Sequence, residues 1–243
     1  MTDRYDHRVK ALLLSAGLGT RLRPLTNRMP KCLVSIGGRP LLSYWFDLLR
    51  ATTIREVLIN THHLREQVAE FMARVNEEGR FHVTESYEPK LLGSAGTIAA
   101  HGDWIKDADS CLVVYTDNLS DVDLSRLIQF HQSHDDPLTM MLFRTPYPQQ
   151  CGIARMNDDA LIVDFVEKPQ VPASNLANAG VYVLSAAAYR EIVDRRAFDL
   201  ARDVLPTFVG RMRGWVHDGY HRDVGSRESL EFARKDAAHL FAT

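Results

Sequence analysis

The sequence predicts an α/β fold with a doubly wound, mostly parallel (Rossmann-like) sheet and an antiparallel extension. Short apolar strands alternate with helical stretches as far as about residue 135, which is typical of parallel βαβ units. The segment Cys111–Tyr115 is continuously apolar, as expected for a strand covered on both faces. From Leu138 onward, strand-like segments follow one another with little helical pattern, which indicates antiparallel pairing.

The first half contains four predicted strands and three predicted helical segments. Pro40 suits the first position of a helix, and Gly79 ends another. Apolar residues at helical spacing define the helices, and short apolar or alternating runs define the strands. In chain order the segments are a strand at 11–14, a helix at 41–49, a strand at 57–60, a helix at 64–75, a strand at 81–86, a short helical segment opened by 93–97 and a strand at 111–115.

The second half is richer in strands. The predicted strands are 138–143, 153–156, 161–166, 181–184 and 215–217, and the predicted helices are 186–193, 199–209 and 226–240. No linker or charge run divides the chain, so we expect one domain over residues 1–243. There is no hexapeptide repeat of the kind that builds a β-helix.

Composition and charge narrow the function classes. The 243 residues carry a formal net charge of −2, which does not favour a nucleic-acid-binding protein. The polar N-terminus and short apolar run fit neither a signal peptide nor a membrane span, so we expect a cytoplasmic protein without a membrane partner. The three cysteines are scattered, which indicates neither a disulfide framework nor a zinc site. Adjacent His62 and His63 would point to different sides of a strand or helix, which disfavours a shared metal.

The strongest functional signal lies between Ala11 and Lys31. An apolar run ends in Gly17-Leu18-Gly19-Thr20-Arg21, and further cations follow at Arg23, Arg28 and Lys31. Glycines let a backbone turn present its N–H groups to an anion, and cations neutralise the remaining charge. We therefore expect a polyanionic ligand. Neither a P-loop nor a dinucleotide fingerprint fits, because Thr20 follows Gly19 and Leu22 takes the place of a third glycine. The alternative is an ordinary strand-to-helix turn with a solvated basic face.

This stretch resembles the signature of the sugar-1-phosphate nucleotidyltransferases. The residues that match are Gly17, Gly19, Thr20, Arg21, Leu22, Pro24, Leu25, Thr26, Pro30 and Lys31. The resemblance implies that Arg21 and Lys31 are catalytic and hold the triphosphate and the leaving pyrophosphate. It also places the backbone from the strand end through the loop beside the nucleotide, at Leu14, Ala16, Gly17, Gly19 and Thr20.

A second glycine segment, Gly93-Ser94-Ala95-Gly96-Thr97, has small residues that would allow backbone to approach a flat base closely. It resembles the stretch with which family members hold the base, so Gly93 and Gly96 are nucleotide-binding candidates. Its form is similar to that of mannose-1-phosphate guanylyltransferases, which favours GTP.

Asp117 directly follows a buried strand, where a carboxylate is costly unless something pairs with it. A metal ion is a natural partner, and the alternative is a cap for the next turn or for a helix near Asp123. In the family an aspartate here holds catalytic Mg²⁺ and contacts the nucleotide. The pair Asp117-Asn118 resembles the thymidylyltransferase form, which opposes the preference for GTP.

Asp223, in Arg222-Asp223-Val224-Gly225-Ser226, resembles the second metal ligand of the family. The alternative role of this segment is to start the last helix, since Ser226 is a good N-cap, and both roles are compatible.

Phe165-Val166-Glu167-Lys168-Pro169 resembles the motif with which the family binds the sugar phosphate. Lys168 is a compact charge suited to phosphate, and Pro169 ends the strand so that the pair lies at its tip. A surface ion pair is the alternative. Further resemblances add Asn118, Gly152 and Asn178 to the sugar-phosphate candidates. Cys151 stands where an aromatic residue is more usual, which leaves the sugar open.

The sequence thus indicates an enzyme that makes an NDP-sugar and pyrophosphate from an NTP and a sugar 1-phosphate with Mg²⁺. GTP with a mannose- or heptose-type sugar 1-phosphate is favoured, while UTP, dTTP and CTP stay open, as does a homo-oligomer. About 1–135 is the expected nucleotide-binding half, and about 136–243 the sugar-phosphate-binding half. A non-catalytic nucleotide-sugar sensor should lack Arg21, Lys31 or a metal aspartate, and a nicotinamide-dependent oxidoreductase should have the third glycine. The chain meets neither condition.

Overall fold

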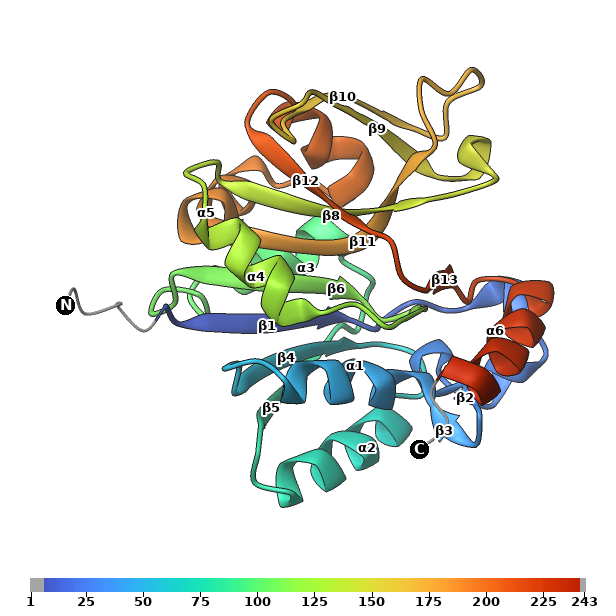
Figure 1. Cartoon of the computed structure of the whole chain (residues 1–243). Coiled ribbons are helices and arrows are strands. Elements are labelled where there is room, and N and C mark those ends of the chain that lie inside the picture. The colour runs from blue at the N-terminus through green and yellow to red at the C-terminus, as the bar shows by residue number, and fades with distance from the viewer. Residues whose placement is uncertain (1–6, 241–243) are drawn as a thin grey trace. The chain divides into compact units, whose positions relative to one another are not determined.

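The computed structural model describes residues 7–240, which form two compact units (Figure 1). Unit 1 contains the described part of Met1–Ala11 together with Leu92–Val114 and Leu124–Asp218. Unit 2 contains Leu12–Leu91, Tyr115–Asp123 and the described part of Gly219–Thr243. Each unit is thus assembled from three stretches, and strands β1 (Val9–Leu14) and β6 (Ser110–Tyr115) contribute residues to both. The assignment of nucleotide and sugar roles to the two sequence halves stays a prediction.

Unit 1 is built on a mixed sheet in which the strand order is β10-β9-β11-β6, followed by β1, while β8 pairs with β11 and β12. Pairing is antiparallel among β8 to β11 and between β11 and β6, but β12 runs parallel to β8. The antiparallel extension is therefore confirmed. The strands are β8 (Leu138–Arg144), β9 (Gly152–Met156), β10 (Ile162–Glu167), β11 (Leu176–Ser185) and β12 (Met212–His217), and the helices are α3 (Ser94–Ala100), α4 (Leu124–Gln132) and α5 (Ala186–Arg195).

Unit 2 contains the order β1-β4-β5, with β4 and β5 parallel, and two small antiparallel ladders. Its ladders pair β2 (Ser35–Ile36) with β3 (Arg39–Pro40) and β7 (Asn118–Ser120) with β13 (His221–Asp223). The other elements are β4 (Glu56–Thr61), β5 (His82–Tyr87), α1 (Leu41–Arg50), α2 (Arg65–Glu77), α6 (Arg227–Leu240) and three short 3-10 helices, η1 (Thr20–Leu22), η2 (Leu25–Asn27) and η3 (Lys31–Leu33). The α/β class predicted from the sequence is confirmed.

Aromatic packing joins the helices of unit 2 to its sheet. Phe46 of α1 lies 5.7 Å, ring centroid to centroid, from Phe71 of α2 and 5.3 Å from Phe81, which precedes β5. All three rings are buried, and rings at such distances add to the stability that burial alone provides. The apolar stripe at 68, 71, 72 and 75 faces this core, as its helical spacing predicts.

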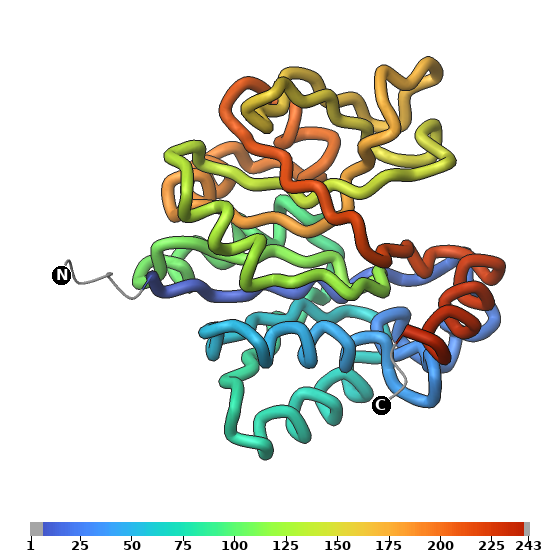
Figure 2. Tube along the Cα trace, in the orientation of Figure 1, coloured from blue at the N-terminus to red at the C-terminus, as the bar shows by residue number. Residues whose placement is uncertain are grey.

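The C-terminal helix packs against the N-terminal part of the same unit. Leu230, Ala233 and Ala237 of α6 are buried in one cluster with Ile36 and Tyr44. Figure 2 shows this helix, in red, beside the blue segment that contains β2. Small alanines allow close helix packing, so α6 holds the segment that follows the glycine loop.

One predicted helix has a different form. Residues 199–209 contain a π-helix, η5 (Leu200–Val204), followed by a 3-10 helix, η6 (Leu205–Phe208). Pro206 has no N–H to donate and its ring clashes with an α-helical turn, which explains why an α-helix does not run through the segment. Among residues 7–240, no helix is long and apolar enough to span a membrane.

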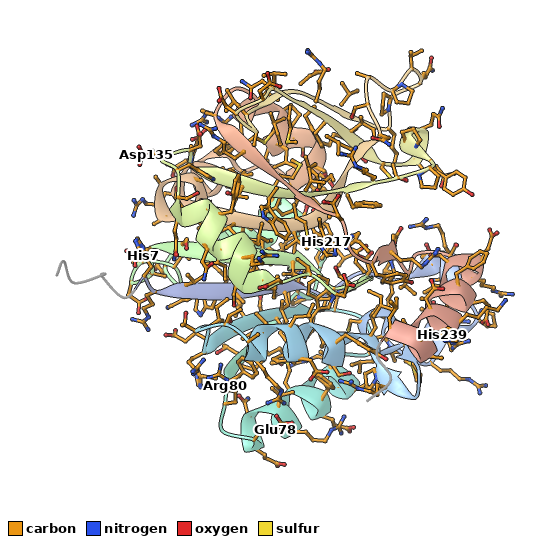
Figure 3. The ribbon with its side chains drawn as sticks, viewed as in Figure 1. His7, Glu78, Arg80, Asp135, His217 and His239 are labelled. Atoms are coloured by element: carbon orange, nitrogen blue, oxygen red, sulfur yellow. The ribbon has the colours of Figure 1, made fainter. Side chains whose placement is uncertain are left out.

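A histidine pair in unit 1, with His131 buried and His134 half-buried, makes folding stability depend on pH. His131 Nδ1 and His134 Nε2 each lie 2.9 Å from the Thr139 hydroxyl. Burial, with the nearby His134 and His7 charges, lowers the pKa of His131 to about 4. Burial also lowers the pKa of His134, aided by Arg213 and opposed by Asp136 and Asp135. Figure 3 labels His7, just before β1, and Asp135, after α4.

We expect the free energy of unfolding to fall as the pH drops from about 6.5 towards 4. Unfolded His131 takes up a proton near its ordinary pKa of about 6.5, whereas the folded side chain does so only near 4, so the unfolded state binds more protons in this window. Each such group contributes at most about 1.4 kcal/mol per pH unit. Urea unfolding of wild type and His131→Gln between pH 7 and 4.5 measures the slope, with exposed His82→Gln as control. An unchanged slope in His131→Gln would contradict this account.

Candidate active site

The predicted site residues are distributed over both units. Unit 2 holds the phosphate-side candidates, which are Leu14, Ala16, Gly17, Gly19, Thr20, Arg21, Lys31, Asp117 and Asp223, and also Asn118, a candidate for binding the sugar phosphate. Unit 1 holds the base-side and sugar-side candidates, which are Gly93, Gly96, Gly152, Glu167, Lys168 and Asn178.

The glycine loop turns sharply at Gly19, which has a φ of 60° and begins η1. A Cβ at this position would lie 2.8 Å from Thr26 Cγ2 and 3.1 Å from Lys31 Cβ. The Thr26 hydroxyl donates a hydrogen bond to the Gly19 carbonyl at 2.8 Å. Only glycine fits both the left-handed backbone and this close packing. The turn thereby brings Lys31 against the loop.

Lys31 is the central cation of unit 2. Its side chain is only 9% exposed, and its Nζ donates to Asp117 Oδ2 at 2.5 Å and lies 3.7 Å from Asp223 Oδ1. A buried ammonium group is costly without such partners. Two carboxylates more than a hundred positions apart in the chain therefore converge on one lysine.

The β7–β13 ladder explains this convergence. Asp117 directly precedes β7, and Asp223 ends β13 opposite Asn118. The Val224 N–H also donates to the Asp117 carbonyl at 2.8 Å. The sequences Asn-Leu-Ser and His-Arg-Asp of these two strands contain no apolar run, so the ladder itself was not predicted.

Arg21 is close to Asp223. A Cβ at Gly225 would lie 2.7 Å from Arg21 Nη2 and 2.8 Å from both carboxylate oxygens of Asp223. Any side chain at 225 would thus displace the arginine or the aspartate. Desolvation by the surrounding chain and the neighbouring Asp117 charge raise the pKa of Asp223, whose side chain is still 55% exposed, while Lys31 and Arg21 act in the opposite direction. The geometry gathers two cations and two carboxylates in unit 2.

The paired carboxylates fit a divalent metal such as Mg²⁺. Within residues 7–240, no group of three or more His, Cys, Asp and Glu side chains could hold an ion, so an all-protein cage is absent there. Magnesium commonly uses one or two carboxylates and completes its octahedron with phosphate oxygens and water. Asp117 and Asp223 supply that minimum set, and their mutual repulsion is what a cation would relieve.

Three contacts support the loop and were not predicted, and of these one is buried, one is half-buried and one is exposed. Asn60 accepts hydrogen bonds from the start of the loop, His63 Nε2 lies 2.9 Å from the Thr26 carbonyl oxygen, and Gln67 donates to the Arg28 carbonyl. His62 Nδ1 instead lies 2.7 Å from the Glu88 carbonyl oxygen. The two adjacent histidines thus contact different partners.

Asn118 is buried, and its side-chain amide donates to the Tyr115 carbonyl at 3.2 Å. Its backbone carbonyl accepts from the Trp45 indole N–H at 2.9 Å. These contacts give Asn118 a structural role at the end of β6. Its role in binding the sugar phosphate stays a prediction.

The second glycine segment packs against Phe198 and Leu200 of unit 1. Gly93 has a φ of 75°, and a Cβ there would lie 2.3 Å from the Phe198 carbonyl oxygen. The Ala95 N–H donates to the same carbonyl at 3.1 Å, and the Leu200 N–H donates to Ser94 Oγ at 2.8 Å. Glycine is therefore required at 93 for this packing. Contact of Gly93 and Gly96 with a base stays a prediction.

Three of the sugar-side candidates, Gly152, Glu167 and Lys168, meet at the ends of β9 and β10. Glu167 pairs with Gly152 in the strand register, and a Cβ at Gly152 would lie 2.6 Å from Glu167 Oε2. Burial raises the pKa of Glu167, with Asp199 adding to the rise and Lys168 and Arg202 opposing it. The absence of a side chain at 152 thus leaves room for the glutamate carboxylate across the strand pair.

Lys168 has a φ of 50° and donates its backbone N–H to the Cys151 carbonyl at 3.0 Å. Its Nζ is 3.9 Å from Glu167 Oε1 and its side chain is 63% exposed, so the ion pair is weak and the ammonium group is accessible. Asn178 lies at an irregularity in β11, where its side-chain oxygen accepts from the Gly180 N–H at 3.0 Å.

Comparison with known proteins identifies the family. Residues 10–239 match the family model described as Nucleotidyl transferase. The chain belongs to the nucleotidyltransferase family. Its phosphate-side residues therefore lie in the domain that defines the family, and the predicted sugar-1-phosphate nucleotidyltransferase class is confirmed, with an enzyme activity of the nucleotidyl-transfer type. Enzymes of this family generally depend on a divalent metal.

Named relatives and one solved structure agree with this family. The chain is 34% identical to "Probable mannose-1-phosphate guanylyltransferase 1" of Oryza sativa subsp. japonica, over 97% of this chain and 68% of the relative. It is 31% identical to the mannose-1-phosphate guanylyltransferase of Mycobacterium tuberculosis, over 95% of this nucleotidyltransferase and 64% of the relative. The fold matches that of a Bacillus anthracis protein assigned as a glucose-1-phosphate thymidylyltransferase, solved with sucrose, with a TM-score of 0.86, 22% identity and 96% coverage of both chains.

Proposed function

We propose that this nucleotidyltransferase makes an NDP-sugar and pyrophosphate from GTP and a mannose- or heptose-type sugar 1-phosphate. The observation that carries the proposal is the convergence of Arg21, Lys31, Asp117 and Asp223 beside the glycine loop. The names of the relatives support guanine as the base. The Asp117-Asn118 pair favours thymine, so dTTP is the principal competitor.

The reaction requires two anions to approach each other. An oxygen of the sugar phosphate attacks the α-phosphorus of the NTP, a new P–O bond forms, and the bond between the α-phosphorus and the bridging oxygen breaks as pyrophosphate leaves. Arg21 and Lys31 neutralise charge that develops on the α-phosphate and the leaving pyrophosphate. Mg²⁺ held by Asp117 and Asp223 would add Lewis-acid stabilisation of the phosphoryl oxygens. The proposed role of Lys168 is to hold the sugar phosphate.

Pyrophosphate release from five NTPs, each tested with a panel of sugar 1-phosphates, examines the proposal. We expect release that depends on both substrates, is lost with a metal chelator, and is fastest with GTP and mannose 1-phosphate or a heptose 1-phosphate. Faster turnover of dTTP would reassign the base. Nucleotide-sugar binding without release in any pair would contradict the enzyme assignment and favour the sensor.

Lys168→Ala should raise the KM for the sugar 1-phosphate about 10–100-fold and leave the KM for the NTP nearly unchanged. A hydrogen bond between charged partners contributes about 1.5–3 kcal/mol, which corresponds to this range. Initial rates with either substrate varied measure both constants. Lys106→Ala, another exposed lysine of unit 1, is the control. Equal changes in the two constants would contradict the assignment of Lys168 to the sugar phosphate.

A further inference from the structure

The entrance to the glycine loop is held by a side chain, Asn60, in place of strand pairing. Asn60 lies near the end of β4 and is buried. Its Oδ1 accepts hydrogen bonds from the Ser15 N–H at 2.6 Å and the Ala16 N–H at 3.3 Å. These are the first two residues after β1, so one amide oxygen determines how the chain leaves the strand and enters the loop.

Glu88 sets the orientation of this amide. Its side chain is only 2% exposed, and its Oε1 accepts from Asn60 Nδ2 at 2.9 Å. Two backbone N–H groups donate to Asn60 Oδ1 and a Glu88 oxygen accepts from Asn60 Nδ2, so the NH₂ group of Asn60 faces Glu88 and its carbonyl oxygen faces the loop. Glu88 is itself anchored to β4, because its N–H donates to the Thr61 carbonyl at 2.9 Å.

The opposite side of the loop entrance is held by Thr116. Ser15 Oγ lies 2.8 Å from Thr116 Oγ1, which also donates to the Leu14 carbonyl at 3.0 Å. Thr116 directly precedes Asp117. The loop entrance is thus fixed between the end of β4 and the residue before a proposed metal ligand.

We propose that Asn60, oriented by Glu88, is a positioning residue for the nucleotide loop. This inference rests on the proposed function, because it assumes that the loop binds the triphosphate. The Ser15 and Ala16 N–H groups donate to Asn60 Oδ1, and these two hydrogen bonds fix the direction in which the backbone enters the loop. Arg21 and Lys31 follow within sixteen residues of Ser15, and a shift of about 1 Å in such groups can cost about 10²-fold in rate.

Substitutions can break the hydrogen bond between Asn60 and Glu88 and then restore it with donor and acceptor exchanged. Asn60→Asp keeps an acceptor towards the loop but places two carboxylates together, which repel each other. Glu88→Gln keeps an acceptor towards Asn60. In the double variant, the new amide at position 88 can donate to the new carboxylate at position 60, whose other oxygen still faces Ser15 and Ala16.

We expect Asn60→Asp to lower kcat/KM for the NTP by about 10–100-fold and Glu88→Gln to have a small effect. The double variant should return to within about threefold of Glu88→Gln, and the KM for the sugar 1-phosphate should hardly change in any of them. Hydrogen exchange of peptides that cover residues 12–24 gives a readout independent of activity. Exchange there should rise in Asn60→Asp and fall again in the double variant, while peptides from α5 stay unchanged.

A double variant that does not regain the loop protection and NTP kinetics of Glu88→Gln overturns the proposal, whether or not Asn60→Asp folds alone. Wild-type NTP kinetics and exchange in Asn60→Asp also overturn it. If the wild type forms no NDP-sugar, the proposed function fails, while the exchange measurements still decide whether Asn60 holds the loop.

Discussion

Lys31→Ala is expected to lower turnover by about 10²–10³-fold. The buried ammonium group is the cation that both Asp117 and Asp223 approach, and the proposal assigns it to charge on the α-phosphate and departing pyrophosphate. Losing one stabilising contact of this kind in a transition state typically costs this much. Steady-state pyrophosphate release at saturating substrates is the measurement.

Lys31→Met separates charge from packing, because it keeps most of the aliphatic stem and removes the ammonium group. It should lose nearly as much turnover as Lys31→Ala while retaining a cooperative thermal transition. Lys235→Ala, an exposed lysine of α6 in the same unit, should behave as wild type. Turnover within about threefold of wild type in a folded Lys31 variant would show that this lysine does not act in the chemical step.

Asp117→Asn and Asp223→Asn should each lower turnover by about 10²–10³-fold, and the double variant should be hardly worse than either single one. Groups that act as one unit are non-additive, and we propose that the two carboxylates hold one Mg²⁺. Without the ion, both carboxylates would repel the nucleotide phosphates. Turnover at several Mg²⁺ concentrations measures the effect, and Glu231→Gln, in α6 of the same unit, is the matched control for a carboxylate-to-amide change.

The thermal stability of the Asp223→Asn variant distinguishes a metal-binding role of Asp223 from a structural role. The Asp223 side chain is 55% exposed and is repelled by the Asp117 carboxylate, so Asp223→Asn, which removes this repulsion, should unfold at a temperature close to that of wild type while losing activity. A crystal structure with NTP and Mg²⁺ tests the shared ion directly. An ion bound without contact, direct or through water, to either carboxylate would show that the shared-metal proposal is wrong.

The sequence by itself determined the family, the α/β class and the order of the main elements. These features follow from short-range rules, namely apolar periodicity, glycine and proline positions, and a long motif that runs from Gly17 to Lys31. The same rules failed at residues 199–209, where Pro206 and tertiary packing produce a π-helix and a 3-10 helix.

Only the tertiary structure decided which residues surround the loop. The three-residue strands that bring Asp223 to Asp117 are too short to carry a periodic signal, and their pairing spans about a hundred positions of the chain. Asn60 and Glu88 have no motif of their own, because a hydrogen bond between distant side chains leaves no local pattern in the sequence. Position 93 requires glycine because the carbonyl group of residue 198 lies too close for a side chain. This contact depends on how the chain folds back within unit 1.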